Sequence, residues 1–243
     1  MDKGLFDRYY STHFSRYSSS QTDRGTLELV RRKYKWNYDR FFGSLSKDAR
    51  ILDIGCGLGQ FLYYLGEEGF QKLFGIDISG DQISRAKEAT KKAHFEVADV
   101  FSYLDGKEVA FDVIVMNDFI EHVSKNEVLS LLRMVYQSLK SRGKIIIKTP
   151  NLGSPLTVPG CYADFTHEHG FSEHSLAQVL SVVGFQSICC LQEEIGLYQP
   201  LFFLKKLLVW PLRAGFRLFL YLLEVNPVPK IISANIICTA EKP

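Results

Sequence analysis

The stretch Ile51-Leu52-Asp53-Ile54-Gly55-Cys56-Gly57-Leu58-Gly59-Gln60-Phe61-Leu62 decides the fold of this 243-residue chain. Its first four residues predict the end of a buried strand, and a helix is predicted to begin at Gln60. The three alternating glycines suit the turn between them, because a tight turn uses positive φ and a Cβ would keep a ligand away from the backbone. A dinucleotide-binding fingerprint needs a small residue where Gln60 stands, so dinucleotide binding is disfavoured.

The resulting pattern, Asp-x-Gly-x-Gly-x-Gly, resembles the first motif of class I S-adenosylmethionine (SAM)-dependent methyltransferases. The resemblance implies that the glycine turn approaches the amino-acid part of SAM and that the motif acid helps to place its ammonium group. The residues that it places at the cofactor are Asp53, Gly55, Cys56, Gly57 and Gly59. A generic Rossmann-like turn that binds another nucleotide is the alternative.

Acidic residues also end the next two predicted strands. Asp77 ends the strand 72–78, 22 residues after the first motif glycine, close to where nucleotide-binding folds place an acid for the ribose hydroxyls. A carboxylate suits that role because it accepts hydrogen bonds from both hydroxyls. After the strand 94–97, the resemblance places Asp99 against the adenine amine, with an exposed turn aspartate as the alternative. The residues that follow these two acids complete this part of the predicted cofactor site: Ile78 and Val100.

The fourth predicted strand, 111–116, runs directly into polar residues. By the same resemblance, Asn117 and Asp118 contact the methionyl end of SAM and face the acceptor, and His122 lies close behind them. The pair Glu121-His122 resembles a signature of methyltransferases that act on small molecules, although capping of the next helix is an alternative role.

Strands and helices alternate along the chain. The alternation predicts a doubly wound, mostly parallel α/β sheet, which the resemblance extends to seven strands, with ligands at the carboxyl ends of the strands. The predicted parts are an N-terminal helical lid segment (1–45), a SAM-binding core (46–195), a helical insertion (196–228) and a last core strand (229–243). A helix that merely covers one sheet edge is the alternative to the lid. The other predicted elements are helices at 27–42 with a cap at Thr26 or Gly25, at 81–92, at 125–140 ended by Arg142-Gly143 and after Ser172 or Glu173, and strands at 144–148, 185–191 and 231–240.

Composition excludes several classes of protein. The net charge of +2 is close to neutral, so no nucleic-acid partner is expected. The five cysteines have no C-x-x-C spacing, which argues for a reducing compartment and against a zinc site or a disulfide framework. Residues 1–10 lack the apolar segment of a secretory signal, so a cytoplasmic location is expected, with peripheral attachment to the inner face of a membrane as an option.

A long loop begins at Thr149-Pro150, and three of the six histidines lie in it or just after it. The segment that contains Asp164 and His167 and ends in Gly184-Phe185 resembles methyltransferases that act on sugars, often in polysaccharide or lipid-linked glycan pathways. His167 or His169 is therefore predicted to be a general base toward an acceptor hydroxyl.

Asp164 or Glu168 would orient this base, and His122 completes the candidate catalytic residues. Besides the general base, the loop has two other interpretations. Asp164, His167 and His169 also have the ligand chemistry of a divalent metal site, but no second ligand cluster is evident, and the prediction includes no metal. Polar loop residues that hold the acceptor side together are the third interpretation.

The predicted insertion is dense in Leu, Phe, Trp and Tyr between residues 198 and 223. Its longest uncharged piece between Lys206 and Arg213 has six residues, too few to span a bilayer. On a helical wheel Lys206, Arg213 and Arg217 fall within about 40° of one another, and Pro211 is predicted to kink or divide the helix. A basic stripe on an apolar helix is typical of attachment to a membrane surface, and a homodimer contact or a cap on the core are the alternatives.

The sequence therefore predicts a SAM-dependent methyltransferase whose acceptor atom is an oxygen, namely a sugar hydroxyl in a glycan or lipid-linked glycan pathway. SAM is the expected cofactor, and a small molecule or glycan is the expected acceptor. Methylation of a hydrophobic small molecule, such as a quinone or lipid precursor, is an alternative. From a different class, a SAM-binding interaction module without turnover is another.

Overall fold

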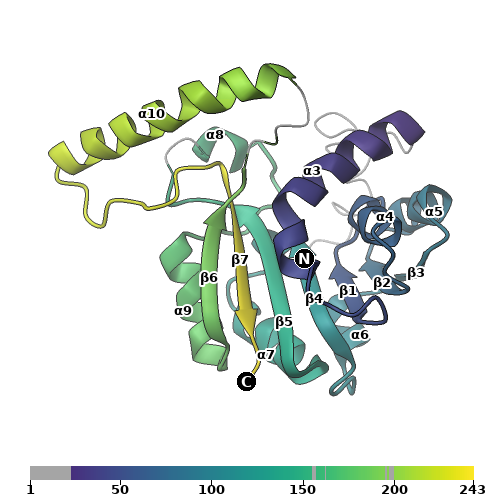
Figure 1. The fold of residues 1–243 in the computed structure, drawn as a ribbon. Helices are drawn as coiled ribbons and strands as arrows, with labels where there is room; N and C mark the ends of the chain where they lie inside the picture. The colour runs from purple at the N-terminus through teal and green to yellow at the C-terminus, as the bar shows by residue number, and fades with distance from the viewer. Residues whose placement is uncertain (1–22, 155–156, 162, 195, 197–199) are drawn as a thin grey trace.

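A computed structural model describes residues 23–154, 157–161, 163–194, 196 and 200–243 (Figure 1). Most of the predicted lid segment before its helix at 27–42 therefore lies outside the described residues, as does Tyr198 at the start of the apolar insertion. Seven strands of the described residues form one sheet in the order β3-β2-β1-β4-β5-β7-β6. Their bounds along the chain are β1 Arg50–Ile54, β2 Lys72–Asp77, β3 Ala93–Val97, β4 Phe111–Asn117, β5 Leu139–Pro150, β6 Gln186–Gln192 and β7 Asn235–Glu241.

Strand β7 runs antiparallel to both of its neighbours, β5 and β6, whereas the other adjacent pairs are parallel. The predicted seven-stranded, mostly parallel sheet is thus confirmed, with the apolar insertion between β6 and β7. The central strands are apolar runs buried on both faces, as parallel sheets require: the stretches 51–52, 113–116 and 145–147 are fully inaccessible to solvent.

Helices cover the two faces of the sheet and build two cores (Figure 1). On one face lie α3 (Arg24–Phe42), α4 (Gln60–Glu67) and α5 (Gly80–Ala89), which pack with an aromatic cluster around Phe61. On the other lie α6 (Val100–Leu104), α7 (Val128–Ser138) and α9 (Glu173–Val183). The short helices η2 (Ile120–His122) and α8 (Val158–Cys161) lie in the connections that follow β4 and β5. This arrangement leaves the carboxyl ends of the parallel strands for a ligand.

Several predicted helix boundaries were wrong. Helix α3 begins after Asp23, whose side chain accepts hydrogen bonds from the backbone of Gly25 and Thr26, so Asp23 is the cap rather than either of those residues. Helix α5 ends at Ala89 rather than near residue 92. Ser172, one of the two predicted caps, does cap α9, and it forms a capping box with Ser175.

The largest shift concerns the end of α7. The helix was predicted to continue to residue 140 and to end at Arg142-Gly143, but it ends at Ser138, and β5 begins at Leu139. Tertiary contacts explain the difference, because Leu139 pairs with Phe111 in β4 and Lys140 forms an ion pair with Asp112 at 2.8 Å. These contacts draw the segment into the sheet in spite of its helical pattern.

The apolar insertion forms one helix, α10 (Pro200–Leu222), which continues through Pro211 and is therefore not divided by it. The helix lies across one end of the molecule (Figure 1). Its least exposed described side chains recur at spacings of three and four residues, and two of them are basic: Lys206 contacts Glu194 and Trp36, and Arg213 donates to Gln192. Two of the three residues of the basic stripe thus face the protein, whereas Arg217 is exposed together with large apolar side chains.

The outward face of α10 bears on the alternatives for the insertion. Large apolar side chains such as Leu208, Trp210 and Leu212 are 65–76% exposed, so the helix is not a cap that buries its apolar residues on the core. Attachment to a membrane surface and a contact between subunits both stay predictions. No helix in the described part of the chain combines the length and the unbroken apolar sequence that crossing a bilayer requires.

We expect the paired substitutions Leu208→Glu and Trp210→Glu to change the free energy of unfolding by less than about 1 kcal/mol, because exposed positions contribute about 0.5 kcal/mol each at most. Urea unfolding measures the change. Val209→Glu, on the partly covered face, is the matched control and should cost more. A loss above about 2 kcal/mol in the double variant would contradict the exposed orientation. Co-sedimentation with anionic vesicles tests attachment to a membrane surface, and size-exclusion chromatography tests a contact between subunits.

Candidate active site

A cavity of about 740 Å³ opens at the carboxyl ends of β1, β2 and β4 and is closed on one side by α3. Its volume lies in the range of pockets that hold small molecules and cofactors. Val30, Lys33 and Tyr34 of α3 line it, so part of the predicted lid segment does form a wall of the cavity. Ten of the eleven predicted cofactor residues also line it: Asp53, Gly55, Cys56, Gly57, Asp77, Ile78, Asp99, Val100, Asn117 and Asp118.

The glycine turn shapes the floor of this cavity. Gly55 and Gly57 have φ of 70° and 51°, a conformation that favours glycine. A Cβ on Gly55 would lie 2.5 Å from the ring of Phe119, and one on Gly57 would lie 2.9 Å from Gln82. Gly59, the eleventh predicted residue, is not among the lining residues. It precedes α4 with φ of 70° and is crowded by Phe95, so it shapes the turn.

Asp53 presents a buried carboxyl group with an unused acceptor. The residue is 1% exposed, and its Oδ1 atom has no hydrogen-bond partner among the described residues. Burial, and secondarily the charge of Asp77, raise the pKa of Asp53 well above its ordinary value. An ammonium group in the cavity would relieve both effects, so Asp53 fits the role that the motif predicts for it.

Asp77 is held in place by the glycine turn itself. Its two carboxylate oxygens accept hydrogen bonds from the backbone N–H groups of Gly57, at 3.0 Å, and Ser79, at 2.8 Å. Burial raises the pKa of Asp77, and these backbone donors partly offset that effect. Each carboxylate oxygen has a second lone pair, so the group retains the capacity to accept from vicinal hydroxyls.

Asp99 has a structural role beside its place in the cavity. It caps α6, because its Oδ1 atom accepts from the backbone of Phe101 and Ser102. This five-residue helix was not predicted from the sequence, although an aspartate before an apolar run is a capping signal. The contact of Asp99 with adenine stays a prediction.

The end of the cavity near β4 contains charged and aromatic groups that the sequence analysis missed. The buried Lys148 of β5 donates to Asp118 at 2.5 Å, and Tyr38 of α3 donates to Asn117 at the same distance. Burial lowers the pKa of Lys148, but Asp118 and Glu193 outweigh burial, so the net shift is upward and Lys148 is charged. Nothing local marks Lys148 in an apolar strand as functional, because its partner lies 30 residues away.

The four candidate catalytic residues do not all reach the cavity. His122 lines it, whereas Asp164, His167 and His169 are not among the lining residues. His169 packs edge-on against Phe171 with ring centroids 4.7 Å apart, and burial lowers its pKa. The roles of His167 and His169 as bases stay predictions, and His122 is the candidate that the cavity contains.

The long loop between β5 and α9, called the acceptor loop from here on, orients His122. Its Nδ1 atom lies 3.2 Å from the carbonyl of Thr166 and 2.8 Å from the Thr166 hydroxyl, which in turn donates to Asp164 at 2.7 Å. A carbonyl only accepts, so Nδ1 carries the ring proton and Nε2 carries the lone pair. Burial, followed by the proximity of His167, lowers the pKa of His122 to about 4, so the ring is neutral at neutral pH.

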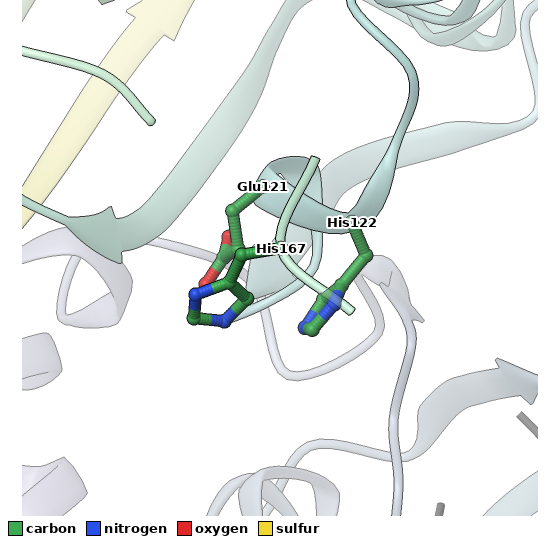
Figure 2. Close-up of side chains that lie close together, drawn as sticks. All are labelled: Glu121, His122 and His167. Carbon is green, nitrogen blue, oxygen red and sulfur yellow. The ribbon is translucent and has the colours of Figure 1, made fainter. Parts of the chain in front are cut away.

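Glu121 and His167 lie next to His122 (Figure 2). The ring centroids of the two histidines are 4.8 Å apart. Glu121 is fully buried and accepts from Thr149 through Oε2, whereas Oε1 has no partner among the described residues. Burial, and then the charge of Asp118, raise the pKa of Glu121 to about 8.

The fold and the cavity together define a Rossmann-like SAM-dependent methyltransferase, and the comparisons agree. Residues 27–189 match the family described as Methyltransferase domain, and the chain belongs to that family. Phosphoethanolamine N-methyltransferase 1 of Arabidopsis thaliana is 29% identical over 203 residues, which cover 70% of this chain and 40% of that protein. The chain spans less than half the length of the first curated relatives that it matches.

Solved structures share the fold. A SAM-dependent methyltransferase from Archaeoglobus fulgidus matches over 100% of both chains, with a TM-score of 0.65 and 21% identity. Phosphoethanolamine N-methyltransferase 2 of Haemonchus contortus, solved with SAM, matches 98% of this chain and 60% of its own, with a TM-score of 0.61 and 18% identity. These structures share the fold, and membership of the Methyltransferase domain family identifies the chain as a SAM-dependent methyltransferase. The family match disfavours the alternative of a binding module without turnover.

Proposed function

We propose that the chain transfers the methyl group of SAM to a hydroxyl oxygen, and that a sugar carries this hydroxyl. The observation that carries the proposal is His122 at the acceptor end of the cavity, fixed by Thr166 and backed by Glu121 and His167. The sugar is suggested by the acceptor loop, whose sequence resembles that of sugar-modifying methyltransferases and which supplies Thr166 and His167.

The chemistry explains why such groups favour an oxygen acceptor. The cofactor supplies an electrophilic methyl group on a sulfonium, which leaves as a neutral thioether when the new bond forms. A neutral hydroxyl is a poor nucleophile, so it must lose its proton as the O–C bond forms and the C–S bond breaks. The cluster at His122 can withdraw that proton directly or can hold a cation that favours its loss to solvent.

The remaining residues position the reactants. Asp53 and the glycine turn would hold the amino-acid end of the cofactor, and Asp77 would hold its ribose. The buried pair Lys148–Asp118 and the hydroxyl of Tyr38 on Asn117 make the acceptor end polar and rigid. Fixing two reactants in line is a large part of the rate enhancement in such transfers.

An amine is the second candidate acceptor, and the relatives favour it. Phosphoethanolamine N-methyltransferases are among the curated proteins most similar to this chain. Asp118 and Glu127 line the cavity and would suit a cationic acceptor, and Lys148 and Lys33 would suit an attached anion. An amine that enters without its proton needs no base, so the cluster at His122 would then be unexplained.

The test is a set of acceptors incubated with the full chain and methyl-labelled SAM. Methyl glycosides and nucleotide sugars represent the first proposal, and phosphoethanolamine represents the second. Label in a methyl ether of a sugar, with none in phosphoethanolamine, is the expected result. Label in phosphoethanolamine alone would overturn the oxygen acceptor.

Thr166→Val should lower kcat about 10-fold and leave the Kd of SAM unchanged. Thr166 positions His122 from outside the cavity, and valine keeps its shape without the hydroxyl. Thr166→Ser is the matched control and should restore most of kcat, because it restores the hydroxyl. Steady-state kinetics on the identified acceptor and a SAM titration give both values. An equal loss of kcat in Thr166→Val and Thr166→Ser would show that the hydroxyl of Thr166 does not position His122.

A further inference from the structure

Three side chains with metal-binding atoms converge beside the cavity: Glu121 and His122 of η2, and His167 of the acceptor loop (Figure 2). One ligand atom from each lies within 4.8 Å of the other two, and Glu121 and His122 are buried. Two imidazoles and one carboxylate are a donor set that divalent transition-metal ions take in proteins.

Both imidazoles are held in the tautomer that metal binding requires. The Nδ1 atom of His167 lies 2.8 Å from the carbonyl oxygen of Cys161, so it carries the proton and Nε2 carries the lone pair. His122 is fixed in the same way by Thr166. A hydrogen bond from the second ring nitrogen to a carbonyl or hydroxyl is the usual support of a metal-bound histidine.

Glu121 is a second and independent observation. Its side chain is fully buried, Thr149 engages Oε2, and Oε1 has no partner among the described residues. A buried carboxyl oxygen without a partner is costly, and coordination of a cation is one way to offset that cost. The backbone carbonyl of Glu121 accepts from Glu168, which ties the loop that contains His167 to η2.

We propose that Glu121, His122 and His167 bind one divalent first-row transition-metal ion at the acceptor end of the cavity. Metal–ligand bonds of about 2.0–2.2 Å set ligand atoms roughly 3–4 Å apart, so the three side chains need to close by only about 1 Å. His122 lines the cavity, and an ion on it would lie next to the acceptor. The catalytic role of the ion, which favours loss of the hydroxyl proton, rests on the proposed function, but its binding does not.

This site differs from the metal site considered in the sequence analysis. Of the set Asp164, His167 and His169, only His167 belongs to the cluster of described residues. Oδ1 of Asp164 accepts from Thr166 and its Oδ2 lies 3.8 Å from Nε2 of His167, so Asp164 flanks the cluster, and His169 packs against Phe171. The other two proposed ligands come from η2, 46 and 45 residues earlier than His167. The proposed site therefore takes two of its three ligands from outside the loop.

The test is a titration of the chelator-treated full chain with Co²⁺, followed by its visible absorption, with Zn²⁺ as a competitor. We expect one Co²⁺ per chain, and Glu121→Gln and His167→Gln should each weaken binding about 10- to 100-fold. Glutamine keeps the shape of the neutral carboxyl, and circular dichroism confirms folding. His174→Gln is the matched control, because His174 lies on α9 outside the cluster and is 58% exposed, and it should bind Co²⁺ like the wild type.

The outcomes separate this inference from the proposed function. No Co²⁺ bound by the wild type, or equal affinity in Glu121→Gln, His167→Gln and the control, overturns the metal site whatever the acceptor. If the wild type binds Co²⁺ and the two variants bind it more weakly as expected, the metal site is supported. If the same chain methylates only phosphoethanolamine, the oxygen acceptor is overturned while the metal site stands. As a measurement that needs no variant, Zn²⁺ should raise the thermal unfolding midpoint of the wild type, since a ligand that binds only the native state stabilises it.

Discussion

Replacing Asp53 with Asn should weaken SAM binding about 10- to 100-fold, the effect of losing a charge-assisted hydrogen bond of about 1.5–3 kcal/mol. Asp53 is buried with an unused oxygen at the cavity, and the cofactor's ammonium group is the charge that would pair with it. Isothermal titration with SAM measures the loss. Asp48→Asn, at an exposed site far from the cavity, is the control and should bind SAM like the wild type.

The same variant should be more stable than the wild type without ligand, and the difference should grow with pH. The pKa of Asp53 in the folded protein lies above its ordinary value of 3.8. The unfolded chain therefore ionises first, and the wild type loses stability as pH rises from about 4 through the folded pKa, which asparagine does not. Urea unfolding between pH 4 and pH 8 measures the difference. A constant difference across this range, or a less stable variant, would contradict the buried, uncompensated carboxyl group.

Gly55→Ala should abolish measurable SAM binding and lower the free energy of unfolding by about 2–4 kcal/mol. A positive φ costs a non-glycine residue about 1–2 kcal/mol, and a clash in a packed site costs about 1–3 kcal/mol more. The new Cβ would lie 2.5 Å from Phe119, on the surface that the cofactor must approach. SAM titration and urea unfolding test the two effects separately.

Gly106→Ala is the matched control for this prediction. Gly106 has φ of 68°, almost that of Gly55, but a Cβ there would meet nothing within 4 Å. It should therefore show only the backbone cost of about 1–2 kcal/mol and keep full SAM affinity. If the two variants lose equal stability and both bind SAM, the turn at Gly55 is not a close approach to the cofactor.

The cofactor half of the site could be predicted from the sequence because its determinants are local. A strand, a glycine turn and a helix follow one another within 51–67, and each later acid stands at the end of its own apolar run. In a parallel sheet these ends meet at one edge, so Asp53, Asp77 and Asp99 had to lie near one another. No long-range contact had to be known.

The acceptor half could not be predicted in the same way, because distant segments assemble it. The long loop after β5 is fixed by a bridge between Asn151 and Phe171, which brings His167 back onto η2. The backbone N–H of Glu168 donates to the carbonyl of Glu121 and also holds the loop against η2. The residue types alone suggested several histidines. Only the folded position of the loop on η2 shows that His122, rather than His167 or His169, lines the cavity.

Helix α10 shows a further limit of periodicity. The helical wheel correctly groups Lys206 with Arg213, but it does not say which face meets the protein. Contacts with Glu194, Trp36 and Gln192 turn much of this basic side inward and leave the apolar side exposed. Such partners lie on other elements, so the orientation depends on packing that no local pattern contains.

The proposed function requires that the methyl group of SAM goes to a hydroxyl oxygen. We would incubate the full chain with ¹³C-methyl-labelled SAM and host-cell extract, and identify by NMR the atom that bears the labelled methyl group. We expect a methyl ether on a sugar, formed by the wild type and lost with Gly55→Ala. A labelled methyl group on nitrogen, with no methyl ether formed, would contradict it.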